Sequence, residues 1–136
     1  MLDNYESDNM VKKAWVDDSG CDICPASESI NHIVLRCQNA DKVWERLHLA
    51  AVATRCSTLA EFMNLSMTDT MPSGWAECFA ACAWTLWTAR NDRVFNNRAT
   101  ARSRLFSRIR EELGLWATRD SEKASAIGFW AQKFQV

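Results

Sequence analysis

Cys21-Asp22-Ile23-Cys24, followed by His32 and Cys37, is the stretch that decides the fold we expect for this chain. Its spacing, C-x2-C-x7-H-x4-C, gathers three thiols and one imidazole within 17 consecutive residues. Three cysteines and one histidine are a complete ligand set for a four-coordinate structural zinc site, and they leave no open position for a catalytic water. The sequence therefore predicts a structural zinc ion that fixes the geometry of the N-terminal third.

The same four residues are also compatible with disulfide bonds, or with buried cysteines beside a core histidine. Residues 1–10 are polar and acidic and contain no apolar run typical of a signal sequence. No stretch approaches the ~20 apolar residues that a membrane-spanning helix requires. We therefore expect an intracellular protein, in the nucleus or the cytoplasm, that does not bind membranes. Thiols stay reduced in these compartments, which favours a metal site over disulfides.

The composition indicates a single helical domain. The chain has 136 residues, of which 48% are hydrophobic and 24% charged, values ordinary for a globular protein. Four glycines and two prolines are too few for an all-β fold with many tight turns, and no segment alternates between apolar and polar residues as a half-buried strand does. We expect an all-α fold, a small helical domain with an N-terminal CCHC zinc knuckle.

The order of signals along the chain predicts four parts. Residues 1–7 are expected to be disordered, residues 8–66 to form a zinc-binding helical module, residues 67–72 to be a linker, and residues 73–136 to form a helical segment packed on that module. Residues five apart on an α-helix are offset by about 140°. A helical run from about Asn31 must therefore loosen near Cys37 if His32 and Cys37 are to hold the same ion.

Five further helices are predicted after Cys37. Asn39 is expected to cap a helix that reaches about Ala53. Thr58-Leu59-Ala60-Glu61 matches a capping box and opens a short helix. The remaining helices are expected over residues 73–96, after a cap at Thr100, and over residues 121–134.

Several segments together resemble a known family. They are Cys21-x2-Cys24 with Glu28-Ser29, His32 and Cys37; Val43-Trp44-x2-Leu47; the upstream run Asp8-Asn9-Met10-Val11-Lys12-Lys13-Ala14-Trp15; and Trp84-x2-Trp87-x2-Arg90-Asn91-x3-Phe95 followed by Trp116. This compound pattern, over about residues 8–118, looks like the zinc-binding domain of plant non-LTR retrotransposon reverse transcriptases.

The resemblance implies a zinc site formed by Cys21, Cys24, His32 and Cys37. Members of that family usually have Gly where this chain has Pro25, so the knuckle turn is expected to differ. Their module normally lies between a reverse-transcriptase domain and a ribonuclease-H-like domain. This chain contains neither, which implies a stand-alone fragment derived from a retrotransposon polyprotein.

The charges are unevenly distributed along the chain. Residues 1–85 carry six Lys/Arg against twelve Asp/Glu, whereas residues 86–119 carry eight Arg against three acidic residues. An arginine run within the second block has two interpretations: it follows a phosphate backbone, or it pairs with the acidic N-terminal half. Its members are Arg98, Arg102, Arg104, Arg108 and Arg110. An overall isoelectric point near 6 argues against strong unspecific binding of nucleic acid.

The remaining candidates are hydrophobic. Seven tryptophans exceed what a core of this size requires, so some are predicted to contact a partner. The candidates for that interface are Trp75, Trp87, Trp116 and Trp130. Cys56, Cys78 and Cys82 are expected to pack in the core, where Cys behaves as a small hydrophobe. His48 is expected to be a partly exposed side chain without a ligand role.

Catalysis has no support in the sequence. Ribonuclease-H chemistry needs several carboxylates around magnesium, and no such constellation, P-loop, dinucleotide fingerprint or H-E-x-x-H is present. We predict no enzymatic activity and no small-molecule substrate. The leading hypothesis is a zinc-stabilised protein-interaction module, and the alternative is a nucleic-acid-binding module that uses the Arg-rich helix 98–110. Partner identity and oligomeric state stay open.

Overall fold

The computed structural model describes residues 29–68 and 71–135. Within these residues the secondary structure consists of helices and no strand, which confirms the all-α class for this part of the chain. The elements are, in order, η1 (His32–Arg36), α2 (Gln38–Arg46), α3 (Ala50–Arg55), α4 (Leu59–Ser66), α5 (Trp75–Asn96), α6 (Arg102–Arg119) and α7 (Ala124–Gln132). The predicted zinc knuckle at Cys21 and Cys24 lies outside the described residues.

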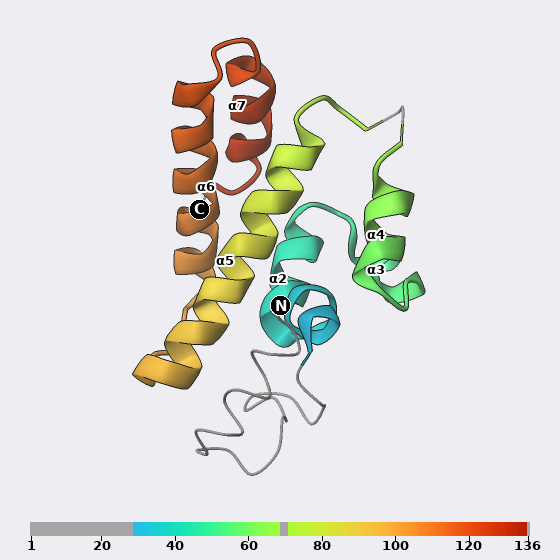
Figure 1. Cartoon of the computed structure of the whole chain (residues 1–136), viewed down its shortest axis with the longest axis vertical. Helices are drawn as coiled ribbons and strands as arrows, with labels where there is room; N and C mark the ends of the chain where they lie inside the picture. The colour runs from blue at the N-terminus through green and yellow to red at the C-terminus, as the bar shows by residue number, and fades with distance from the viewer. Residues whose placement is uncertain (1–28, 69–70, 136) are drawn as a thin grey trace.

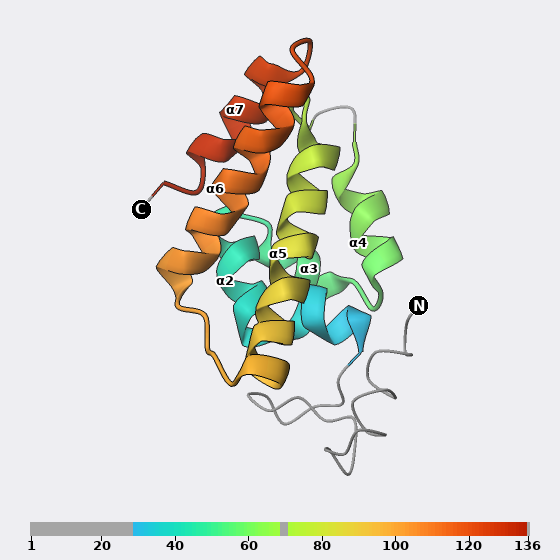
Figure 2. The same ribbon diagram turned by 60° about the vertical axis from the view of Figure 1, so that its left-hand side comes forward.

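The long helix α5 is the element around which the others are arranged. Figures 1 and 2 show α6 and α7 as an antiparallel pair along one side of α5, with α4 on the opposite side. Both η1 and α2 contact α5, and α2 also contacts α6. One hydrophobic core joins side chains from both sides. The described residues of the predicted segments 8–66 and 73–136 therefore share a single core. None of the described helices is both long and apolar enough to cross a membrane.

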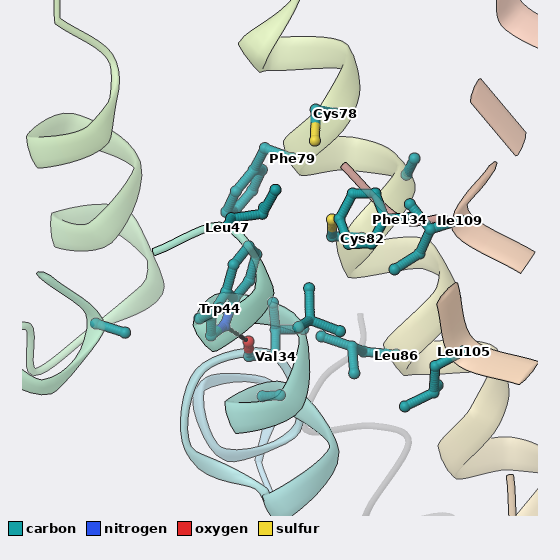
Figure 3. Close-up of a cluster of buried hydrophobic side chains, with 14 of the residues drawn as sticks. Val34, Trp44, Leu47, Cys78, Phe79, Cys82, Leu86, Leu105, Ile109 and Phe134 are labelled. Atoms are coloured by element: carbon teal, nitrogen blue, oxygen red, sulfur yellow. Dashed lines mark hydrogen bonds between the residues drawn. The ribbon is translucent and has the colours of Figure 1, made fainter. Parts of the chain in front are cut away.

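Trp44 of α2 lies at the centre of the aromatic part of this core. Its side chain is fully buried, and its ring centroid lies 4.8 Å from that of Phe62 and 5.9 Å from that of Phe79. Its indole Nε1–H donates a hydrogen bond of 2.8 Å to the Val34 carbonyl, drawn in Figure 3. This bond satisfies the one polar atom of the side chain and fixes η1 against α2.

The predicted helix from Asn39 to Ala53 is wrong, because the chain breaks it into α2 and α3 at His48. There the Leu49 N–H donates to the Trp44 carbonyl at 2.8 Å and the His48 N–H to the Glu45 carbonyl at 3.0 Å. These two bonds, with His48 at a φ of 61°, form a Schellman motif. Glycine normally takes this left-handed position, and a histidine there gave no stop signal in the sequence.

Other predicted helix ends agree with the structure more closely. The Thr58 capping box is confirmed, with the Glu61 N–H donating to Thr58 Oγ1 and the Glu61 carboxylate accepting from the Thr58 N–H. Helix α5 ends at Asn96 as predicted, and the following Asn97 has a φ of 55°.

Helices α5, α6 and α7 begin later than the sequence predicts. The predicted cap at Thr100 is wrong, because Ala101 occupies the N-cap position of α6 and makes no side-chain cap. Helix α5 begins only after Gly74, whose φ of +93° suits glycine. A Cβ atom at Gly74 would lie 3.0 Å from both the Ala126 carbonyl oxygen and Trp130 Cδ1, so α7 also requires a glycine there.

Candidate metal half-site and apolar groove

Two of the four predicted zinc ligands, His32 and Cys37, lie in the described part of the chain, at the two ends of η1. The loosening expected near Cys37 takes the form of a π-helix over His32–Arg36. The Cys37 N–H donates to the His32 carbonyl at 2.7 Å, an i→i+5 bond. Such a bond brings residues five apart close to the same side of the helix, whereas in an α-helix they would be offset by about 140°.

The surroundings of His32 suit a metal ligand. Its side chain is buried, and within residues 29–68 and 71–135 its Nε2 atom has no hydrogen-bond partner. Burial lowers the pKa of His32 below its ordinary value, and the nearby Arg93 charge lowers it further, while Asp41 opposes this. A lowered pKa keeps the imidazole neutral, which is the form that binds zinc.

Cys37 is the second predicted ligand within the described residues, and its side chain is also buried. No group of three or more His, Cys, Asp or Glu side chains with metal-binding geometry occurs in the described ranges. Cys21 and Cys24 lie outside them. The described residues therefore provide one imidazole and one thiol, both buried and both held by η1, as one half of the predicted ligand set.

The remaining described cysteines lie in the core, as expected. Cys78 and Cys82 are fully buried on the inner face of α5, and Figure 3 shows both among apolar side chains. Burial, together with the hydrogen bond to the Cys78 thiol, raises the pKa of Cys82 well above its ordinary value. The Cys82 thiol therefore stays protonated, which makes it a poor metal ligand and a poor nucleophile.

Four members of the predicted arginine run make contacts within the protein. Arg108 pairs with Asp92 of α5 at 3.0 Å, and Arg110 donates to the Phe134 carbonyl at 2.7 Å. Arg104 lies 3.7 Å from Glu111, with both side chains largely exposed. The Arg102 guanidinium lies 5.4 Å from the Phe106 ring centroid. The contacts of these arginines are thus with α5, α6 and the C-terminal end.

The four tryptophans predicted for an interface fall into two groups. Trp75 and Trp130 are buried and need correction, since their indole N–H groups donate inside the fold, to Ser66 Oγ at 3.0 Å and to the Ser73 carbonyl at 2.9 Å. Trp87 and Trp116 are partly buried against the core. The helical spacing of these tryptophans therefore reflects helix faces that pack toward the core.

The most exposed described tryptophan is instead Trp84 of α5, with 54% of its surface accessible. It borders a groove of about 470 Å³ between η1, α4 and α5. The lining side chains are all uncharged and apolar: Ile30, Val34, Leu59, Met63, Met67, Ala76, Phe79, Ala80, Ala83, Trp84 and Trp87. Trp84 occurs in the motif that carries the family resemblance. The core stripe of α5 lies on another face of the helix, and the exposure of Trp84 could not be predicted from that motif.

A second part of that motif forms a local unit on α5. The Arg90 side chain is buried, its guanidinium lies 5.0 Å from the Trp87 ring centroid, and it donates to Asn91 Oδ1 at 2.6 Å. A buried guanidinium needs such partners, because burying a charge without them is costly. Trp87 and Asn91 therefore provide partners for the buried guanidinium of Arg90.

Taken together, the described residues define an all-helical protein that carries half of a candidate metal site next to an open apolar groove. Comparisons of the chain with protein-family models, with curated proteins and with solved structures find no match.

Proposed function

We propose that this chain is a non-catalytic, zinc-stabilised module that binds a helical segment of a protein partner in the groove between η1, α4 and α5. The observation that carries the proposal is the groove itself. Four of its side chains are large, apolar and exposed: Ile30 (45%), Met63 (38%), Met67 (40%) and Trp84 (54%). Contiguous apolar surface of this kind is typical of interaction sites.

The lining of the groove specifies the chemistry of the occupant. Because no charged side chain lines it, it favours an uncharged apolar stripe over a charged one. No strand occurs in the described residues, so the pairing of a peptide with a sheet edge has no template there. An amphipathic helix with apolar residues at i, i+3, i+4 and i+7 is the occupant that a groove between helices accommodates. Met63 and Met67 provide flexible side chains that adapt to it.

The proposed zinc ion has a structural role. His32 and Cys37 would hold it together with Cys21 and Cys24, and it would supply a cross-link between the N-terminal segment and η1. Support comes from the buried His32 Nε2 atom without a partner in the described residues and from the i→i+5 bond that joins the two ligand positions. The origin of the module in a retrotransposon polyprotein remains part of the proposal and rests on the sequence resemblance alone.

The groove is tested by selecting helical peptides on the native, reduced protein and measuring their affinity for two matched variants. Trp84→Ala removes a side chain that is 54% exposed inside the groove, and Leu115→Ala removes one that is 51% exposed on α6, outside it. We expect Trp84→Ala to weaken binding by about 30-fold, the effect of a hot-spot residue near 2 kcal/mol. Leu115→Ala should leave it unchanged. Equal affinities for both variants would refute the groove as the binding site.

The metal is tested by elemental analysis of protein purified under reducing conditions without added chelator. We expect one zinc ion per chain, lost in His32→Asn and in Cys37→Ser. Cys56→Ser is the control, because Cys56 is equally buried and its thiol donates to the Val52 carbonyl at 3.2 Å, a bond that a serine hydroxyl can replace. Zinc retained by both ligand variants, or absent from the wild type, would contradict the proposal.

Binding of nucleic acid by the Arg-rich helix 98–110 is the weaker alternative. The contacts of Arg108 with Asp92 and of Arg110 with the Phe134 carbonyl draw these two charges toward the protein. The alternative predicts an affinity that falls steeply with salt and that depends on Arg104 and Arg108. A lack of binding to RNA and DNA at low salt would remove it.

A further inference from the structure

A second concave site lies away from the apolar groove, where the C-terminal end of the described chain crosses α2 and α6. It has a volume of about 330 Å³ and is lined by Glu45, Arg46, His48, Arg102 and Lys133. All five side chains are ionisable, in contrast to the uncharged lining of the groove. They come from α2, the turn after it, the first residue of α6 and the residue after α7.

The two arginines of this site are held in place by the fold. Arg46 Nε donates to the Lys133 carbonyl at 2.6 Å, and a second nitrogen of the same guanidinium donates to the Gln135 carbonyl. The guanidinium groups of Arg46 and Arg102 each lie 5.4 Å from the centroid of the buried Phe106 ring. Two positive charges are thus gathered around one aromatic ring, with little freedom left to the first of them.

The charge of the pocket favours an anion. Arg46, Arg102 and Lys133 provide three positive charges against the single carboxylate of Glu45. Within the described residues, no ion pair joins Arg102 or Lys133 to an acidic side chain. Helix α6 begins at Arg102 without a side-chain cap, so the positive end of its dipole adds to the same field.

The neighbouring arginines distinguish a single anionic group from a polymer. Arg104, Arg108 and Arg110 make contacts with Glu111, Asp92 and the Phe134 carbonyl, respectively, so the positive charge does not continue along α6 as an unbroken track. A nucleic-acid backbone needs such a track, whereas one compact anion needs only the pocket. Guanidinium groups bind phosphate oxygens with two parallel hydrogen bonds, and a volume near 300 Å³ suits a small ligand.

We propose that the pocket formed by Arg46, His48, Arg102 and Lys133 binds a phosphate group, carried by a small phosphomonoester or as free phosphate. This proposal is independent of the partner groove, because no side chain lines both sites. Glu45 is the one group that opposes binding. Removal of the Glu45 carboxylate should therefore raise the affinity for phosphate, whereas removal of a guanidinium should lower it.

The test is a titration of the full chain, followed by NMR of the arginine Nε–H and histidine ring signals. We compare three compounds at constant ionic strength: inorganic phosphate, phenyl phosphate and a 5′-hydroxyl oligonucleotide. Chloride is the blank, because screening by salt alone shifts the NMR signals of exposed charged groups. We expect saturable shifts at Arg46, His48 and Arg102 with both phosphate compounds. A preference for phenyl phosphate would identify a phosphomonoester as the ligand, and a preference for inorganic phosphate would identify free phosphate.

Three variants decide the outcome. Arg102→Gln should weaken phosphate binding about tenfold or more, as expected for a charge-assisted contact. Arg104→Gln, two residues further along α6 and outside the pocket, should leave it unchanged, and Glu45→Gln should tighten it. The proposal is overturned if the shifts do not saturate, if Arg102→Gln and Arg104→Gln behave alike, if Glu45→Gln weakens binding, or if only the oligonucleotide binds.

Discussion

Replacement of Trp44 by phenylalanine tests whether the core holds the π-helix that carries the candidate metal ligands. The change removes the indole N–H that donates to the Val34 carbonyl at 2.8 Å. Leaving a buried carbonyl without this donor costs about 1–3 kcal/mol. The smaller ring also leaves a gap beside Phe62 and Phe79, which costs about 1–2 kcal/mol more. We therefore expect Trp44→Phe to lower the free energy of unfolding by about 2–5 kcal/mol, a large part of the stability of a single domain.

Trp130→Phe provides the matched control for this change. Trp130 is also buried and also donates to a backbone carbonyl, that of Ser73, at 2.9 Å. Ser73 is exposed, so water can replace the lost donor, and the expected cost is smaller, about 1–2 kcal/mol. Urea denaturation of both variants at the same pH gives the two free energies.

Hydrogen exchange at the Cys37 amide separates loss of the anchor from general destabilisation. This amide makes the i→i+5 bond to the His32 carbonyl. Trp44→Phe should speed its exchange by more than the loss of global stability explains, because η1 opens locally. Trp130→Phe should not. Equal losses of unfolding free energy in the two variants, or unchanged local exchange at Cys37, would refute the role of Trp44 as the anchor of η1.

Three further changes test local interactions within the fold. Gly74→Ala should lower the free energy of unfolding by at least about 1–3 kcal/mol, because of its φ of +93° and the 3.0 Å approach of α7. Gly114→Ala is the control: a Cβ atom there has nothing within 4 Å, so the free energy of unfolding should rise by about 0.5–1 kcal/mol. Equal melting temperatures of the two variants would contradict both expectations. Thr58→Ala should lower the unfolding free energy by about 0.5–2 kcal/mol and Thr58→Ser by much less, as measured in urea, because serine keeps the cap of α4. The hydrogen bond from Arg108, with a smaller one from Asn96, lowers the pKa of Asp92, so this carboxylate stabilises the fold above the ordinary pKa of about 4 and loses that contribution as the pH falls. The free energy of unfolding should therefore fall more for the wild type than for Asp92→Asn between about pH 6 and about pH 3, a range that brackets the ordinary pKa of about 4. Parallel curves of unfolding free energy against pH would show that the Asp92–Arg108 pair contributes nothing.

The sequence predicted those features of the fold that local interactions determine. Thr58 and Glu61 stand three residues apart and form their capping box without help from the rest of the chain. The need for a looser helix between His32 and Cys37 followed from the angular spacing of residues on an α-helix alone. The break at His48 could not be predicted in this way. It depends on a left-handed backbone conformation at His48, which the hydrogen bonds to the Glu45 and Trp44 carbonyls stabilise.

The apolar groove and the basic pocket could not be predicted either, because both depend on how the helices pack. Helix α5 has apolar residues on several faces, and periodicity cannot tell which face the neighbouring helices cover. In the structure, Leu86 lies in the core and Trp84, two residues earlier, lies at the surface. The basic pocket also escaped prediction, since Arg46, Arg102 and Lys133 are far apart in the sequence and come together only through the fold.

The π-helix η1 connects the two parts of the proposed function. Val34, in the middle of η1, lines the apolar groove and accepts the hydrogen bond from Trp44, while His32 and Cys37 stand at the ends of the same short element. A metal ion held at those ends would therefore order one wall of the groove. By thermodynamic linkage, a metal that tightens partner binding must itself be bound more tightly, by the same factor, when the partner is present. The proposed zinc ion would then influence affinity for the partner as well as stability, and the two effects would be transmitted through five residues of backbone.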